Sequence, residues 1–224
     1  MNRAIISVYR KEGVAEFAAG LARAGMEILS TGGTASALRA AGVLVTEIRD
    51  WTGFPEILGG RVKTLHPKVH AGLLFRRERA DDQEEMKKLG LSPIDLVVVN
   101  LYPFRETLAG PGSSEDEILE QIDIGGPTLL RAAAKNYPSV VVVTDPGDYG
   151  LVGSAVAARR ALSREERRRL AGRAFDHVAS YDAAIAAWFS SGEAFPREIS
   201  LSLEKLHGLR YGENPHQAGA IYRV

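Results

Sequence analysis

The sequence has no cysteine, and this absence excludes disulfides, catalytic thiols and cysteine metal sites. It has no excess of charge of either sign, because 28 Lys and Arg residues balance 28 Asp and Glu residues. Its basic residues must therefore act locally rather than through a general field. No apolar run approaches the ~18 residues of a membrane span, and the N-terminal run is too short for a signal peptide. We expect a cytoplasmic protein that binds neither nucleic acid nor membrane.

Short apolar runs alternate with helical patterns along the chain. The runs that predict strands are residues 4–8, 26–30, 44–48, 94–100 and 140–144. Such alternation is typical of a parallel sheet with helices on both faces, and a hydrophobic content of 45% is enough for a proper core. Glycine and proline within residues 191–197 indicate a boundary after that domain.

Three charged stretches predict helices rather than binding sites. Residues 114–117 and 163–166 have the Ser-x-x-Glu spacing of a capping box, and the second box opens a predicted long helix to about Ser190. The charges of residues 81–90 are best explained as the solvated face of another helix.

The run GGRVKTLHP, residues 59–67, is the strongest candidate for a ligand-binding segment. Glycine pairs let the backbone approach a ligand closely, and Arg61 and Lys63 supply charge-assisted donors for a phosphate or another oxyanion. The alternative is a solvated basic loop.

A second motif, TGGT at residues 31–34, follows a predicted strand and precedes a predicted helix. The backbone N–H groups of this turn, the hydroxyls of Thr31 and Thr34 and the positive end of the helix dipole would form a phosphate cradle. The alternative is a tight turn with threonine caps, which needs no ligand.

A third motif, NLYPF at residues 100–104, ends an apolar strand. Ligands of parallel sheets sit beyond the carboxyl ends of strands, so we expect Asn100 and Tyr102 to project into such a crevice. The alternative is that Tyr102 and Phe104 only cap the core.

The fourth motif, DIGGPTLLRAAAKN at residues 123–136, predicts a helix that begins beside Gly126, since Pro127 suits the first helical position. Arg131 and Lys135 lie four residues apart and share one face. The small alanines between them would let the helix pack closely and bring Lys135 into a crevice. The alternative is a surface helix with ordinary cations.

These motifs and a fifth, LRYGENPHQ at residues 209–217, occur in the same order and with similar spacing in one family. The chain closely resembles the IMP cyclohydrolase region of the bifunctional aminoimidazole carboxamide ribotide (AICAR) formyltransferase/IMP cyclohydrolase. The resemblance implies an α/β fold of the methylglyoxal-synthase-like type, a three-layer, Rossmann-like parallel sheet flanked by helices. It also implies a cyclohydrolase domain over residues 1–198 and the start of a truncated formyltransferase domain over residues 199–224.

The activity that the resemblance implies is the dehydrative closure of formyl-AICAR (FAICAR) to IMP, the last step of de novo purine biosynthesis. This reaction requires no metal and no cofactor. We expect no formyl transfer, because the lysine–histidine pair for that step lies well downstream in the family. The chain would be a truncation, a fragment or one half of a split enzyme. The family dimerises largely through the missing domain, so a homodimer is expected mainly when that domain is present.

The resemblance also implies site residues. The catalytic set around the carboxamide and formyl groups would be Lys63, Tyr102, Asp123 and Lys135. Lys63 or Lys135 would donate or relay the proton, and Asp123 would orient or accept it, with acid and base left open. The residues implied for substrate binding are Lys11, Thr31, Gly32, Gly33, Thr34, Arg61, Thr64, Asn100, Ile124, Gly125 and Gly126.

One loop departs from the family pattern. The family usually has Ser-Val-Ser-Asp-Lys where this chain has SVYRK at residues 7–11. Tyr9 replaces a small hydroxyl side chain, and Arg10 reverses a charge. Phosphate affinity is therefore the property that we expect to be affected.

The histidines predict no metal site. His66 and His70 are four residues apart, but Pro67 lies between them and no acidic third ligand stands at a suitable spacing. His177 and His207 carry no predicted role.

Two other functions compete with cyclisation. A non-catalytic domain of this fold that binds a phosphate ligand or nucleotide would explain TGGT, but it has no need of a proton-transfer set. A methylglyoxal synthase would leave NLYPF and DIGGPTLLRAAAK unexplained.

Overall fold

The computed structural model describes residues 1–223, which form two compact units that divide between Val178 and Ala179. The predicted domain boundary, at residue 198, lies further along the chain. Among the described residues, no helix combines the length and the apolar content needed to cross a membrane.

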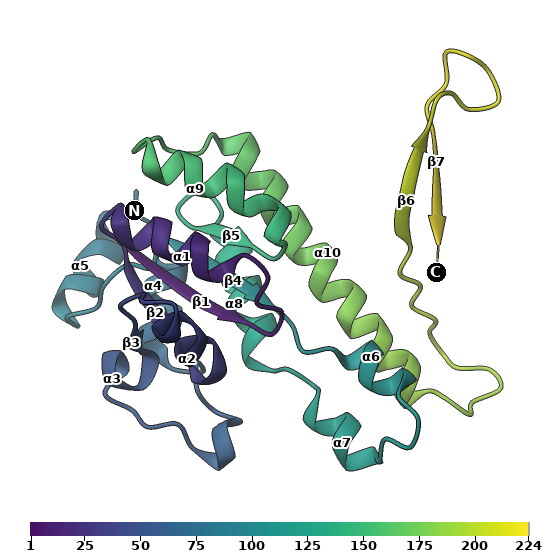
Figure 1. Ribbon diagram of the computed structural model, residues 1–224, viewed down its shortest axis with the longest axis horizontal. Coiled ribbons are helices and arrows are strands. Elements are labelled where there is room, and N and C mark those ends of the chain that lie inside the picture. Colours follow the sequence, from purple (N-terminus) through teal and green to yellow (C-terminus); the bar gives the residue numbers. More distant parts are fainter. Residues whose placement is uncertain (224) are drawn as a thin grey trace. The chain divides into compact units, whose positions relative to one another are not determined.

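Unit 1, which begins at Met1, is built on a single parallel sheet (Figure 1). Its strands are β1 (Arg3–Val8), β2 (Glu27–Ser30), β3 (Thr46–Glu47), β4 (Leu96–Asn100) and β5 (Val141–Val143). The strands lie in the order β3-β2-β1-β4-β5, and every pairing is parallel. The predicted α/β class with a parallel sheet is confirmed.

Helices connect these strands. They are α1 (Val14–Arg23), α2 (Gly32–Ala40), α3 (Ile48–Thr52), α4 (Pro67–Leu74), α5 (Ala80–Lys88), α6 (Phe104–Ala109), α7 (Glu115–Glu120), α8 (Gly125–Lys135), α9 (Tyr149–Ala157) and α10 (Arg164–Phe189), with the short 3-10 turns η1 (Leu58–Gly60) and η2 (Pro146–Asp148). The division between the units falls inside α10.

The core forms on both faces of the sheet. Apolar side chains of α1, α2 and α9 pack together with alternate residues of β1, β2, β4 and β5 in one cluster. On the other side α8 packs on β4 and β5, and α4 packs against α8. All residues of β4 and β5 are buried, as expected for valine-rich strands that are covered twice.

The predicted elements differ from the observed ones mainly at β3. The sequence predicts a strand over residues 44–48, but only Thr46 and Glu47 pair with β2. Leu44 is 88% exposed, and the buried Ile48 already begins α3. An edge strand pairs on one side only, so its length depends on a single neighbour and is poorly determined by its own residues.

Both predicted capping boxes are confirmed. The Ser114 hydroxyl accepts a hydrogen bond from Glu117 N, and the Glu117 carboxylate accepts one from Ser114 N, which starts α7. The same exchange between Ser163 and Glu166 precedes α10, which ends at Phe189 beside the predicted end.

The strand order reverses at β1, and this reversal positions the site. Strands β2 and β3 lie on one side of β1, whereas β4 and β5 lie on the other. The carboxyl ends of β1 and β4 are neighbours, with Val8 opposite Asn100. Ligands of open parallel sheets bind beside such a reversal, so the loops after these two strands are placed to meet a ligand.

Unit 2 contains an antiparallel hairpin of β6 (Glu204–Leu209) and β7 (Gly219–Arg223). Every residue of β6 is exposed, including Leu206 and Leu209. An isolated two-stranded hairpin is marginally stable in water, and stability normally requires further strands or a helix packed on its apolar side chains.

Candidate active site

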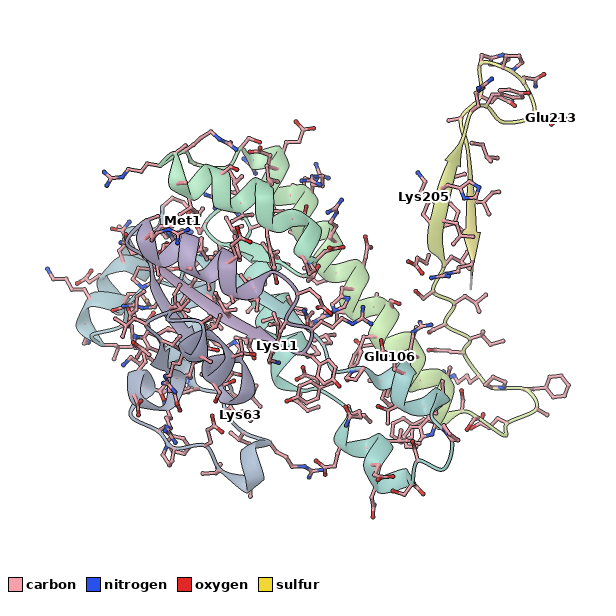
Figure 2. All side chains as sticks on the ribbon, viewed as in Figure 1. Met1, Lys11, Lys63, Glu106, Lys205 and Glu213 are labelled. Atoms are coloured by element: carbon pink, nitrogen blue, oxygen red, sulfur yellow. The ribbon has the colours of Figure 1, made fainter. Side chains whose placement is uncertain are left out.

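A pocket of about 880 Å³ opens at the carboxyl ends of β1, β2 and β4. It is lined by the loops that follow these strands, by residues 58–65 and by residues 119–126. Every predicted site residue except Lys135 lines it. Figure 2 labels two of them, Lys11 in the loop after β1 and Lys63 in the segment between η1 and α4.

Lys63 lies against two glycines that leave room for its side chain. A Cβ atom on Gly60 would stand 2.8 Å from Lys63 Cε, and a Cβ atom on Gly32 would stand 3.7 Å from Lys63 Nζ. Gly60 also has a φ of +89°, in the region that favours glycine. Gly60 of the first motif and Gly32 of the TGGT motif therefore leave the space in which the lysine side chain lies.

Asp123 lies at the start of α8, where backbone N–H groups are unpaired and the helix dipole is positive. Its Oδ1 accepts a hydrogen bond from Gly126 N at 2.8 Å. Burial raises the pKa of the Asp123 carboxyl, and this outweighs the N–H of Gly126, the charge of Lys63 and the N–H of Gly125, which lower it. A carboxylate that is partly desolvated beside a lysine is suited to proton transfer.

The Gly125–Gly126 pair is required by close packing. A Cβ atom on Gly126 would lie 2.4 Å from Asp123 Oδ2 and 2.7 Å from Leu101 Cδ2. A Cβ atom on Gly125 would lie 2.7 Å from the Thr64 hydroxyl oxygen. Any side chain here would displace the carboxylate or the hydroxyl from the pocket wall.

Gly126→Ala is expected to lower the free energy of unfolding by about 1–3 kcal/mol, the usual effect of overpacking. Gly150→Ala is the matched control, because Gly150 lies in α9 with nothing within 4 Å of its Cβ position. That variant should be neutral or gain up to about 1 kcal/mol from the lower entropy of its unfolded chain. Thermal or urea unfolding of the two variants measures the difference, and equal stabilities would contradict the packing described here.

The TGGT motif joins β2 to a helix as predicted, but α2 begins inside the motif, with Thr31 as the N-cap residue and Gly32 as its first residue. The Thr31 side chain makes no capping hydrogen bond, and Gly32 has a φ of +49°. The Thr34 hydroxyl donates to Val8 O and accepts from Val8 N, at 2.9 and 3.1 Å. Thr34 thus ties α2 to the end of β1, while the N-terminus of α2 faces the pocket with Gly32 and Gly33.

Asn100 lines the pocket, but its amide is engaged with the loop after β1. Its Oδ1 accepts hydrogen bonds from Tyr9 N at 2.7 Å and Arg10 N at 3.0 Å, and its Nδ2 donates to Arg10 O at 3.1 Å. The loop after β1 leaves the sheet and needs partners for these backbone groups. Asn100 supplies them, so it shapes the pocket by holding this loop.

Two predicted cations are engaged with neighbouring groups. Lys11 Nζ donates to Val8 O and Tyr9 O, at 3.2 and 3.0 Å. The Arg61 guanidinium pairs with the Glu120 carboxylate of α7 at 2.7 Å, and both side chains are exposed. An exposed pair of this kind is weak, so a bound anion can compete for Arg61.

The structure does not bring Lys135 to the pocket, contrary to the expectation from its helix. Lys135 is exposed at the last position of α8, ten residues from Gly125, which corresponds to about 15 Å along a helix. The following residue, Asn136, donates to Leu73 O and Phe75 O and so fixes this helix end beside the end of α4. The three alanines are buried as expected, whereas Lys135 itself is exposed.

His177 is a pocket-supporting residue that sequence analysis missed. Its Nε2 accepts a hydrogen bond from Leu101 N at 3.4 Å, in the NLYPF segment. Burial lowers the pKa of His177, and the charge of Arg10 lowers it further, which favours the neutral ring that can accept this bond. No sequence signal links residues so far apart, because the contact depends on where α10 packs.

His66 and His70 lie at the start of α4 and within it. His66 Nδ1 accepts a hydrogen bond from Lys68 N and caps α4. Burial lowers the pKa of His70. Within residues 1–223, no three His, Asp or Glu side chains form a group that could hold a metal ion.

Comparisons with known proteins cover the whole chain. The MGS-like domain family matches residues 13–128, and the AICARFT/IMPCHase bienzyme family matches residues 133–224. The bifunctional purine biosynthesis protein PurH of Myxococcus xanthus is 55% identical over 98% of the chain and 43% of the relative. PurH of Anaeromyxobacter dehalogenans is 53% identical over 100% of the chain and 44% of the relative. The chain thus spans less than half the length of these relatives.

A solved structure matches the fold as well. The crystal structure of ForH is 38% identical, with a TM-score of 0.79, over 87% of this chain and 100% of that chain.

Proposed function

Since the chain belongs to the MGS-like domain family and matches the IMP cyclohydrolase domain of the PurH proteins, we propose that it catalyses the closure of FAICAR to IMP. In this reaction the carboxamide nitrogen attacks the formyl carbon and forms the last bond of the purine ring. The formyl oxygen leaves as water, with one proton from the carboxamide nitrogen and one from the formamide nitrogen.

The observation that carries the proposal is one pocket that holds Lys63, Tyr102 and Asp123 beside the turn of α2. The turn offers backbone N–H groups and a helix dipole to the phosphate of the substrate. With the phosphate held at this turn, the base of the substrate would reach the three side chains. Because nucleophile and electrophile belong to one molecule, holding the reactive rotamer accounts for much of the acceleration.

The remaining barrier is proton transfer. An amide nitrogen is a poor nucleophile, and the leaving oxygen must be protonated. In the proposed mechanism Asp123 accepts the carboxamide proton, and the Lys63 ammonium stabilises and protonates the formyl oxygen. The protonated Asp123 then passes its proton to the leaving hydroxyl, which departs as water, and the neutral Lys63 amine takes the formamide N–H proton, so both side chains return to their starting states. The Tyr102 hydroxyl orients the carboxamide. Lys135 has no part in this mechanism, because it does not line the pocket.

The proposal is tested by mixing the purified chain with FAICAR and following IMP formation by absorbance. We expect turnover without an added metal or cofactor. Dihydroxyacetone phosphate is the comparison substrate, since a methylglyoxal synthase would consume it. Conversion of that triose, or IMP binding without conversion of FAICAR, would contradict the proposed function.

We further propose that residues 199–224 belong to a formyltransferase domain that this chain holds only in part. The match of the bienzyme family to residues 133–224 and the exposed apolar residues of the hairpin support this. Limited proteolysis should cleave between residues 190 and 203 and leave a resistant core, identified by mass spectrometry. A hairpin that resists cleavage as well as unit 1 would count against a separate domain.

A further inference from the structure

The aromatic side chain of Tyr9 takes no part in the proposed reaction, yet Tyr9 lines the pocket. Tyr9 is 47% exposed, and Tyr102 is 39% exposed. The two rings meet edge to face, with centroids 6.0 Å apart and planes at 63°. Large apolar surface that remains open inside a pocket is available to a ligand.

The backbone of Tyr9 is positioned by Asn100. Its backbone N–H donates to Asn100 Oδ1 at 2.7 Å, immediately beyond the paired ends of β1 and β4. Next to it, the Arg10 guanidinium pairs with the Glu106 carboxylate of α6, which Figure 2 labels. Asn100 therefore holds the loop with Tyr9 beside the end of β4, from which the segment with Tyr102 continues, while the exposed Arg10–Glu106 pair adds little. The aromatic pair is thus formed before a ligand binds.

The rest of the pocket is suited to other parts of a nucleotide. The start of α2, with Thr31, Gly32 and Gly33, offers backbone N–H groups to a phosphate. Lys63 and Asp123 supply charge for proton transfer. Tyr9 and Tyr102 add the aromatic surface that a flat heteroaromatic ring requires for stacking.

We propose that Tyr9 is a specificity-determining residue, whose ring contacts the imidazole or purine ring of the bound nucleotide while Tyr102 supports it edge-on. This inference rests on the proposed function, since it names which part of that substrate Tyr9 contacts. It gives the Tyr9 ring the role of binding the base, whereas the smaller hydroxyl side chain usual at this position could only form a hydrogen bond.

The test compares Tyr9→Phe and Tyr9→Ser with the wild type by calorimetry, using IMP and ribose 5-phosphate, which lacks the base. Tyr9→Phe keeps the ring and should bind IMP as the wild type does, within about 2-fold. Tyr9→Ser should weaken IMP binding by about 10-fold, as expected for loss of one base-stacking contact, and leave ribose 5-phosphate unaffected. It should also raise KM for FAICAR more than it lowers kcat.

Tyr211→Ser is the control, because Tyr211 is 51% exposed in unit 2 and does not line the pocket. Unchanged IMP affinity in Tyr9→Ser would overturn the inference. Equal weakening of IMP and ribose 5-phosphate would also overturn it, because Tyr9 would then serve the phosphate end. A wild-type chain that neither binds IMP nor forms it would instead refute the proposed function itself. Thermal melting of each variant checks its fold.

Discussion

Replacing Lys63 by methionine is expected to lower kcat for FAICAR closure by about 10²- to 10³-fold, the usual effect of removing one donor to a developing charge. Methionine keeps much of the length of the side chain and removes its charge. The packing of Lys63 against Gly32 and Gly60 allows such a chain, so the fold should persist. The rate of IMP formation at saturating FAICAR measures the effect, and thermal melting checks the fold.

Lys88→Met provides the matched control. Lys88 is exposed in the last turn of α5 and does not line the pocket, so its variant should keep the wild-type kcat. A folded Lys63→Met variant with the same kcat as Lys88→Met would remove Lys63 from the mechanism. A rise in KM with unchanged kcat would make Lys63 a binding residue only.

The second large effect is expected for Asp123→Asn, which should lower kcat by about 10²- to 10⁴-fold, the range for loss of a general base. Asparagine can still accept the hydrogen bond from Gly126 N, which Asp123 Oδ1 accepts at 2.8 Å. The variant therefore removes the basic carboxylate with little change in packing. Asp116→Asn, at an exposed position in the first turn of α7, is the control and should keep wild-type kcat.

The pH profile gives Asp123 an independent test. Burial raises the pKa of its carboxyl above the ordinary value of 3.8, so the basic form is lost at a higher pH than for an exposed aspartate. The value of kcat/KM should therefore fall as the pH decreases, with an apparent pKa above 3.8. This acid limb should be absent from Asp123→Asn. An unchanged limb in the variant would assign the titration to another group.

Local patterns predicted much of the fold, because several elements carry their own signals. The valine-rich runs that became β4 and β5 are typical of buried strands. Ser114 and Ser163 marked helix starts through hydrogen bonds to residues three positions further along the chain. The length of β3 was overestimated, since the two residues that form this strand are set by its pairing with β2.

All residues predicted for the site except Lys135 line one pocket, but the sequence did not show which groups several of these side chains bond to. Lys63 and Asp123 stood out in the sequence because Gly60 and Gly126, which pack against them, lie within a few residues of each. Asn100, Arg61 and His177 instead bond to groups between 59 and 91 residues away. For Lys135 the helix itself was predicted correctly, but the residue lies at the last position of α8 and does not line the pocket.

The most direct test of the account is a single-turnover experiment with the chain in excess over FAICAR. Rapid quenching at a series of times would measure the conversion of bound FAICAR to IMP, with Lys63→Met purified in parallel. The account predicts first-order formation of IMP, equal in amount to the FAICAR supplied, and a rate constant at least 100-fold lower in the variant, as expected for loss of one charge-stabilising donor. Saturable binding without conversion, or equal rates in both proteins, would contradict it.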